Sequence, residues 1–391
     1  MISNLKNFVK RFWPLSIKHE IEQYKNVMRK LNAIQEVLRL RIYELIEAEK
    51  VNAKQLHLIS KELSTTSKTL DRYVKSEQLL YENNELDGKY RVVDLNRFVE
   101  FMRGPDLEKC YINLIDALDG ESKKTVSMIH NRLDKISKSA AKSINLYTQK
   151  EKDELRRQDE YLRSNRFQLS DTCFSTGEFL LPVEYFDRTV FFDLHCKNEI
   201  NNLNKTLNKC IIDAGAYIGD SALVLSKWTQ KNIYCFEAMS KNFELLTKTI
   251  KMNNIENAVP VKLALGDKAG KLKFHYFDYS STCSVNNQAD VETEDVEVVT
   301  LDDYVCENNL DVGLIKVDIE GSEQMFLQGA KKTICEQRPI LLISIYHKPE
   351  DFYYIKPEIE RWNLGYTFKI HKPISKSVII GTVLIAETDK K

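Results

Sequence analysis

The sequence predicts an α/β protein in which a doubly wound parallel sheet follows a long α-helical region. Beyond residue 208, short apolar runs alternate with segments of helical pattern, which is typical of parallel strands covered on both faces. The first of these runs turns through two glycines into an amphipathic segment, as the first crossover of a nucleotide-binding sheet does. Upstream, residues 15–87 contain neither glycine nor proline and repeat apolar side chains on a seven-residue frame, as coiled coils do.

The end of the chain departs from this alternation of strands and helices. Tyr366–Ile370 and Val378–Ala386 are apolar runs separated by a turn that contains Pro and Ser, which predicts a terminal antiparallel hairpin. The strands expected before this hairpin are Cys210–Asp213, Asn232–Phe236, Ala258–Leu263, Leu314–Ile319 and Ile340–Tyr346.

Composition limits the class of protein. The 391 residues have room for two or three domains, and 57 basic side chains balance 57 acidic ones, so the net charge does not indicate a nucleic-acid partner. No apolar run reaches the length of a membrane span, and the N-terminus lacks the core of a signal peptide. The eight cysteines occur singly, without the spacing of a metal site. We therefore expect reduced thiols, a cytoplasmic location and no bound metal.

The patterns divide the chain into four segments. Residues 1–87 are expected to be helical and to form a coiled coil, and 88–165 are expected to be a helical linking region. Residues 166–207 are expected to be β-rich and to cap the site, and 208–391 to form the sheet domain. The β-rich character rests on the short runs Phe179–Val183 and Val190–Leu194, which are bounded by Gly, Pro and Asp.

Two readings of the N-terminal helices stay open. The heptad frame fits an intermolecular coiled coil that makes a homo-oligomer, and it fits equally an intramolecular pair of helices that breaks near Glu49–Asn52. The pattern of residues 1–13 predicts a basic amphipathic helix that ends at Pro14. We favour packing of this segment against the next helix, because one short segment has only marginal membrane affinity. The alternative is contact with the inner face of the membrane.

The glycine turn after the first strand predicts the cofactor. Cys210–Ser221 places Gly215 and Gly219 four residues apart and lacks the third glycine with which a dinucleotide site admits a pyrophosphate. The absence also weakens the alternative of a nicotinamide oxidoreductase. Asp213, before the turn, suits a ligand with positive charge. S-adenosylmethionine, a nucleoside without phosphate that carries a sulfonium and an ammonium group, meets both demands. The cofactor-binding residues expected in this turn are Asp213, Gly215, Ala216, Tyr217, Gly219 and Asp220.

Two further strand ends are expected to contact the nucleoside. Glu237 directly follows the second strand, 24 residues after Asp213, where a carboxylate accepts hydrogen bonds from both ribose hydroxyls. The alternative for Glu237 is a helix-start residue favoured by the helix dipole. Ala264, Leu265 and Asp267 follow the third strand, where the adenine edge is expected, although their sequence also fits a plain turn.

The fourth and fifth strands end in polar groups that fit an acceptor site. Alternation along the fourth strand puts Lys316, Asp318 and Glu320 on one side, and charges there are costly unless they are paired or used. His347 ends the fifth strand and titrates near neutral pH, as a general base does. A structural ion pair between Lys316 and Asp318 and a structural histidine are the alternatives.

These motifs together resemble the FkbM family of S-adenosylmethionine-dependent methyltransferases. The resemblance rests on the turn Asp213–Asp220, on Phe236-Glu237, on Ala264–Asp267 and especially on Ile315-Lys-Val-Asp-Ile-Glu-Gly-Ser-Glu323. It extends over roughly residues 208–386. It implies a class I methyltransferase fold with a reversed last strand, and O-methylation of sugar hydroxyls in surface glycans or of natural products. Ala238, where many relatives have proline, leaves the Glu237 carboxylate in place.

The expected activity is S-adenosylmethionine-dependent O-methylation of a glycan or nucleotide-sugar hydroxyl. His347 is the first candidate for the base and Asp318 the second, while Glu320 and Lys316 orient the acceptor. Residues 166–200, including His195, are expected to cap the acceptor side. The alternative is a coiled-coil interaction protein whose methyltransferase-like module binds the cofactor without turnover.

Overall fold

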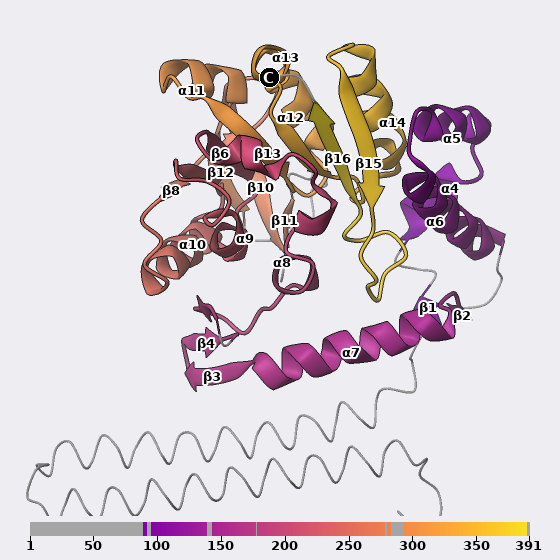
Figure 1. Ribbon diagram of the computed structural model, residues 1–391, viewed down its shortest axis with the longest axis horizontal. Coiled ribbons are helices and arrows are strands. Elements are labelled where there is room, and N and C mark those ends of the chain that lie inside the picture. Colours follow the sequence, from indigo (N-terminus) through magenta and orange to yellow (C-terminus); the bar gives the residue numbers. More distant parts are fainter. Residues whose placement is uncertain are drawn as a thin grey trace, which may run out of the picture. The chain divides into compact units, whose positions relative to one another are not determined.

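The computed structural model describes residues 89–91, 95–138, 143–176, 178–277, 280–282 and 293–388 (Figure 1). The amphipathic segment 1–13 and the predicted coiled coil lie outside the described residues, and so does the predicted oligomer contact. In the part of the chain that is described, no helix is long and apolar enough to cross a membrane.

A mixed seven-stranded sheet forms the centre of the protein. Its order is β15-β16-β14-β13-β6-β7-β8, with β6, β7, β8, β13 and β14 mutually parallel and β16 antiparallel to both of its neighbours. The terminal hairpin is therefore present, and its second strand is inserted beside β14. The strands are β6 (Cys210–Ala214), β7 (Ile233–Phe236), β8 (Ala258–Val261), β13 (Val312–Val317), β14 (Ile340–Ser344), β15 (Tyr366–His371) and β16 (Val383–Thr388).

Successive side chains of the central strands enter two separate cores. Ile212 and Ile315 join the core under one face of the sheet, whereas Ile211 and Leu314 join the core under the other. Helices cover both faces, so the strands are apolar throughout. The first face is covered by α11 (Leu301–Glu307), α12 (Glu323–Gly329), α13 (Lys331–Gln337) and α14 (Pro349–Arg361), and the second by α8 (Arg188–Phe191), α9 (Asp220–Leu225) and α10 (Ser240–Met252).

The helices expected to link the two halves of the chain pack on the sheet domain instead. Phe101 stacks on Tyr353 of α14 with ring centroids 4.9 Å apart, and the Ser122 hydroxyl accepts a hydrogen bond of 3.0 Å from the backbone N–H of Ile370 in β15. All described residues fall in one compact unit. The elements of this region are β1 (Lys89–Arg91), α4 (Asn96–Phe101), α5 (Leu107–Ile115), α6 (Gly120–Lys138), β2 (Ser143–Asn145) and α7 (Gln149–Asn165).

The segment 166–207 is only partly β-structure. Residues 179–183 contribute to the small sheet as expected, but Val190–Leu194 is not a strand, because Asp187 caps a helical turn at this point. The Asp187 carboxylate accepts a hydrogen bond of 2.7 Å from the backbone N–H of Thr189, which starts α8. The elements are β3 (Phe167–Ser170), β4 (Cys173–Ser175), β5 (Leu180–Leu181), and short 3-10 turns at Lys197–Glu199 and Leu203–Thr206.

A second sheet, absent from the sequence-based prediction, follows β8. Its order is β11-β10-β12-β9, and β12 alternates between exposed and buried side chains. A short alternation over residues 295–298 was the available signal, since acidic and apolar residues alternate in Asp295-Val-Glu-Val298. The strands are β9 (Ala264–Leu265), β10 (Gly270–Phe277), β11 (Ser280–Thr282) and β12 (Thr293–Val299).

Candidate active site

A cavity of about 210 Å³ opens at the carboxyl ends of β6, β7 and β13. The strand order reverses between β6 and β13, and ligands of open α/β sheets bind at such a switch point. Its walls come from the glycine turn after β6, the end of β7, the second sheet, the end of β13 and the segment around α8. The residues predicted for the site that line it are Gly215, Tyr217, Asp220, Glu237, Ala264, Leu265, Lys316, Asp318 and Glu320.

The glycine turn lies directly against the end of β13. Gly215 has a φ of +80°, and a Cβ atom on it would lie 1.9 Å from the carbonyl oxygen of Asp318. The turn is also fixed to β7, because the backbone N–H groups of Gly215 and Ala216 both donate to the Phe236 carbonyl. Gly219 follows with a φ of +85° at the start of α9. Neither Ala216 nor Gly219 lines the cavity, so both act on the shape of the turn.

This contact predicts a stability effect at Gly215. Gly215→Ala is expected to destabilise the protein by at least about 2 kcal/mol, because an L side chain is strained at this φ and has no room. Thermal unfolding should show a midpoint lowered by about 4–8 °C. Gly270→Ala is the matched control, because nothing lies within 4 Å of a Cβ at Gly270. Equal midpoints for the two variants would contradict the close approach.

Glu237 has the position expected of a ribose ligand. Its carboxylate accepts hydrogen bonds from the backbone N–H groups of Tyr217 (3.0 Å) and Met239 (2.9 Å), which hold it at the cavity wall. The residue is 8% exposed, and burial raises the pKa of its carboxyl to about 7. Burial also raises the pKa of Asp220, on the same wall, to about 7.

Asp213 does not reach the cavity. It is 0% exposed, forms an ion pair of 2.9 Å with the Lys316 ammonium and accepts a hydrogen bond of 2.7 Å from the Ser221 hydroxyl. The prediction that Asp213 contacts the cofactor is therefore not supported by its position. Lys316 also donates to the Gly215 carbonyl at 2.7 Å, so the pair connects β13 to the glycine turn. Burial lowers the pKa of Lys316, but Asp213 and Asp318 outweigh it and the pKa lies above its usual value.

The expected adenine end is formed by the second sheet. Ala264 and Leu265, in β9, line the cavity, whereas Asp267 is exposed and does not. In the same sheet, β10 and β12 contribute apolar side chains that the sequence-based prediction missed. The missed lining residues include Leu272, Phe274 and Val298 from the second sheet, Met239 and Asn242 near α10, and Tyr346 and Ile380 beyond β14.

After β13, Asp318 and Glu320 line the cavity, but His347 does not. The Tyr346 hydroxyl donates to Asp318, at 3.0 Å from Oδ1 and 3.3 Å from Oδ2. Burial and Asp318 raise the pKa of Tyr346 well above its usual value, so this hydroxyl stays a donor.

The surroundings of His347 are acidic. Its Nδ1 lies 2.9 Å from Glu323, and its Nε2 lies 3.4 Å from Asp318 and 3.6 Å from Glu320. Burial lowers the pKa of His347, but the effect of Glu323, Asp318 and Glu320 is larger and raises this pKa to about 9. Asp318 lines the cavity and His347 does not, and a raised pKa disfavours the neutral imidazole that a base requires, so both observations favour Asp318 as the candidate base.

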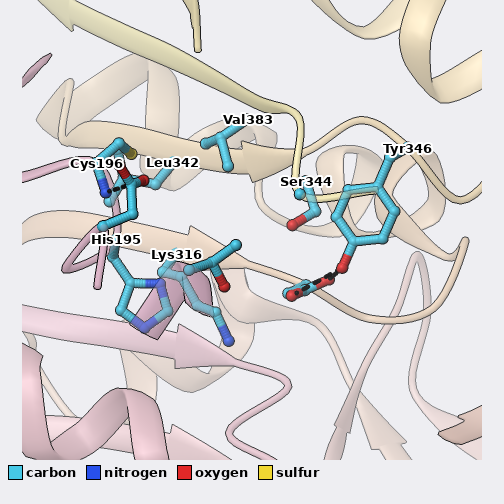
Figure 2. A pocket seen from close by; sticks show the side chains of 11 residues that line it. His195, Cys196, Lys316, Leu342, Ser344, Tyr346 and Val383 are labelled. Carbon is cyan, nitrogen blue, oxygen red and sulfur yellow. Dashed lines mark hydrogen bonds between the residues drawn. The ribbon is translucent and has the colours of Figure 1, made fainter. Parts of the chain in front are cut away.

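The segment before β6 contributes to the wall of the cavity, and its role as a cap on the acceptor side stays a prediction. Tyr185, Thr189 and His195 line it, and a smaller cavity of about 30 Å³ continues behind them toward β14 and β16. Figure 2 shows the His195 ring beside the Lys316 side chain, and it shows the hydrogen bond that the Tyr346 hydroxyl donates to the Asp318 carboxylate. Burial and Lys316 lower the pKa of His195 to about 3, so the ring is neutral.

Comparison with known proteins gives the family of this site. Residues 213–369 match the family model described as the methyltransferase FkbM domain. These residues are an FkbM methyltransferase domain. The match confirms the resemblance predicted from the motifs and, for this domain, the predicted class of S-adenosylmethionine-dependent methyltransferase. It extends from the glycine turn to β15 and so includes every predicted site residue.

Solved structures give more distant similarities. A methyltransferase FkbM from Methylobacillus flagellatus KT is 19% identical, with a TM-score of 0.46, over 71% of this chain and 58% of that chain. This chain thus spans less than two thirds of that relative's length. An rRNA methylase from Streptococcus thermophilus is 15% identical over 48% of this chain and 91% of its own (TM-score 0.30). TYW2 from M. jannaschii, in complex with AdoMet, is 16% identical over 56% and 83% (TM-score 0.28). No curated protein matches the chain.

Proposed function

We propose that this protein is an S-adenosylmethionine-dependent O-methyltransferase whose acceptor is a sugar hydroxyl of a surface glycan or its precursor. The observation that carries the proposal is a single cavity that is lined by residues suited to the cofactor and by residues suited to an acceptor. Its lining within the FkbM domain includes Gly215 and Glu237, which follow β6 and β7, and Asp318 and Glu320, which follow β13; the part lined by Asp318 and Glu320 is called the acceptor end.

The residues that follow β6 and β7 fit the cofactor. Gly215 lets the backbone pass where no side chain has room, and Glu237 offers a carboxylate already oriented by two backbone N–H groups. Tyr217, Ala264 and Leu265 complete this wall, and no cluster of basic groups that a pyrophosphate requires lies there among the described lining residues. When bound, S-adenosylmethionine supplies an electrophilic methyl group on a sulfonium.

The protein has to position the acceptor oxygen and take its proton. Asp318 lines the cavity, and Tyr346 holds its carboxylate by a hydrogen bond, so Asp318 is the residue placed to accept the hydroxyl proton. Glu320 is placed to accept a second acceptor hydroxyl. Lys316 is bound to Asp213 and to the Gly215 carbonyl, so its role is to fix the end of β13 against the glycine turn.

The charge of the acceptor end supports a neutral acceptor. Asp187, Asp318 and Glu320 all line the cavity, and such carboxylates repel the phosphates of a nucleic acid. Ile380 and Met325 line the cavity too and are 54% and 42% exposed, which suits the apolar face of a sugar ring. The cysteines of the described residues are free thiols, which supports a cytoplasmic, reducing location.

The function is tested by incubating the full chain with S-adenosylmethionine and a panel of cell-surface sugars and their nucleotide-linked precursors. Release of S-adenosylhomocysteine, together with a gain of one CH₂ in the mass of one acceptor, is the expected result. Binding of S-adenosylmethionine without release on any sugar, in the presence of a supplied divalent metal, would instead favour the non-catalytic interaction protein.

The raised pKa of Glu237 predicts a pH-dependent cofactor affinity. The ionised carboxylate accepts two ribose hydroxyls and the protonated form does not, so affinity for S-adenosylmethionine should rise with pH through about 7. Calorimetry between pH 5.5 and 8.5, values bracketing that pKa by about 1.5 units, measures the effect. Glu237→Gln should flatten the profile. A profile unchanged in that variant would assign the titration to Asp220, whose pKa is also about 7.

A further inference from the structure

We propose that Asp318, Glu320 and His347 form a binding site for a divalent first-row metal ion at the acceptor end of the cavity, with Glu323 orienting the imidazole. The site deepens the proposed function, because it would place a cation where the acceptor oxygen is expected. The cysteine and histidine spacing in the sequence predicted no metal, since the ligands come from two strands that meet only in the fold.

The distances fit shared ligation better than hydrogen bonding. His347 Nε2 lies 3.4 Å from Asp318 Oδ1 and 3.6 Å from Glu320 Oε2. Two ligand atoms that each lie about 2.0–2.2 Å from one ion are separated by roughly 3.0–3.6 Å at octahedral to tetrahedral angles. One carboxylate oxygen each from Asp318 and from the supporting Glu323, and one ring nitrogen of His347, lie within 4.8 Å of one another.

A second observation is the state of the His347 ring. The side chain is 10% exposed, and within the described part of the chain neither ring nitrogen has a hydrogen-bond partner, although Nε2 lies between two carboxylates. Leaving a buried nitrogen without a partner is unfavourable, so Nε2 is expected to bind a ligand. Imidazole and carboxylate together suit ions such as Mn²⁺ and Zn²⁺.

Glu323 stands where a metal-binding histidine has its supporting carboxylate. Its Oε1 lies 2.9 Å from His347 Nδ1 and accepts a hydrogen bond of 3.0 Å from the backbone N–H of Ile319. Glu323 is 0% exposed, so its position is fixed by packing. A carboxylate on one imidazole nitrogen directs the other nitrogen toward the ion, and removing such a partner typically costs 10–100-fold in metal affinity.

The carboxylates around His347 carry negative charge that the nearby lysines do not balance. Asp318, Glu320 and Glu323 surround the ring, and Asp351 adds a fourth, buried carboxylate that interacts with Glu323 and His347. The two lysines near them are engaged elsewhere. Lys316 pairs with Asp213, and Lys348 donates to the Gly321 carbonyl. A proton on His347 is the alternative way to balance these carboxylates, and the experiment has to distinguish the two.

The test measures metal binding directly, without cofactor or acceptor. The full chain is stripped with a chelator and titrated with Mn²⁺ under electron paramagnetic resonance and with Zn²⁺ by calorimetry. One ion per chain is expected. Asp318→Asn and His347→Gln should each weaken binding at least about 10-fold, and Glu323→Gln by about 10–100-fold. Glu320→Gln, at an exposed position that cannot disturb the core, should also weaken it.

Glu336→Gln, on the exposed face of α13, is the control and should bind the ion as the unchanged protein does. Binding that is absent, or that none of the four ligand-site variants weakens, would overturn the site and leave the proton as the balancing charge. The proposed function fails separately. One bound ion in a protein that transfers no methyl group supports the site alone, and chelator-resistant methyl transfer without metal binding supports the function alone.

Discussion

Glu237→Ala is expected to lower the affinity for S-adenosylmethionine by about 2–4 kcal/mol, a loss of roughly 30- to 1,000-fold. The carboxylate that would accept two ribose hydroxyls is removed. Its backbone donors, the N–H groups of Tyr217 and Met239, also lose the acceptor that holds the glycine turn against β7. Isothermal titration calorimetry at pH 8, about one unit above the Glu237 pKa, measures the change.

Two controls separate ligand loss from disturbance of the fold. Glu237→Gln keeps an acceptor for one backbone N–H and should lose less affinity than Glu237→Ala. Glu244→Ala, on the exposed face of α10, should bind the cofactor normally. Unchanged S-adenosylmethionine affinity in Glu237→Ala would contradict the assignment of this strand end to the ribose. New affinity for a nicotinamide dinucleotide in its place would revive the oxidoreductase alternative.

Asp318→Asn is expected to lower turnover by about 10²- to 10⁴-fold, the usual worth of a positioned general base. The amide keeps the size of the side chain and an acceptor for the Tyr346 hydroxyl, but it takes no proton from the acceptor. Cofactor affinity should stay nearly intact, because the glycine turn contacts the main chain of Asp318, which the substitution leaves unchanged, and Glu237 follows a different strand. Release of S-adenosylhomocysteine and calorimetry with S-adenosylmethionine measure the two quantities.

Asp311→Asn, an exposed change at the ion pair with Lys209, is the matched control and should leave turnover unchanged. His347→Gln decides between the two candidate bases when metal binding is measured alongside. Near-normal turnover in Asp318→Asn, with turnover lost and metal binding retained in His347→Gln, would return the role of base to His347. Loss of cofactor affinity in both variants would remove both residues from the acceptor end.

Short patterns within one stretch of chain predicted the backbone of the site. Gly215 and Gly219 mark positions where φ is positive, and Glu237 follows an apolar strand, so both could be placed from local residue types alone. The doubly wound topology then brings strand ends together, because parallel strands share one carboxyl edge. Asp318 and Glu320 could therefore be assigned to the same crevice as the glycine turn, and both line the cavity.

The partners of charged side chains could not be predicted in this way. Asp213 was assigned to the cofactor from its charge, but the fold buries it against Lys316. Lys316 is far from Asp213 in the sequence and reaches it only because β6 and β13 are neighbours in the sheet. His347 was expected to be a free base at a strand end. Carboxylates from the loop after β13 and from α12 surround it and raise its pKa.

The amino-acid sequence by itself determined the strands of the main sheet, the glycine turn, the place of Glu237 at a strand end of the cavity and the family. Only the tertiary structure decided that Asp213 is buried against Lys316, that Asp318 lines the cavity and His347 does not, and that the second sheet contributes to the cavity wall. The reason is physical. Backbone conformation and strand ends follow from residues adjacent in the chain, whereas burial, pKa and ligand geometry depend on groups that folding brings together from distant segments.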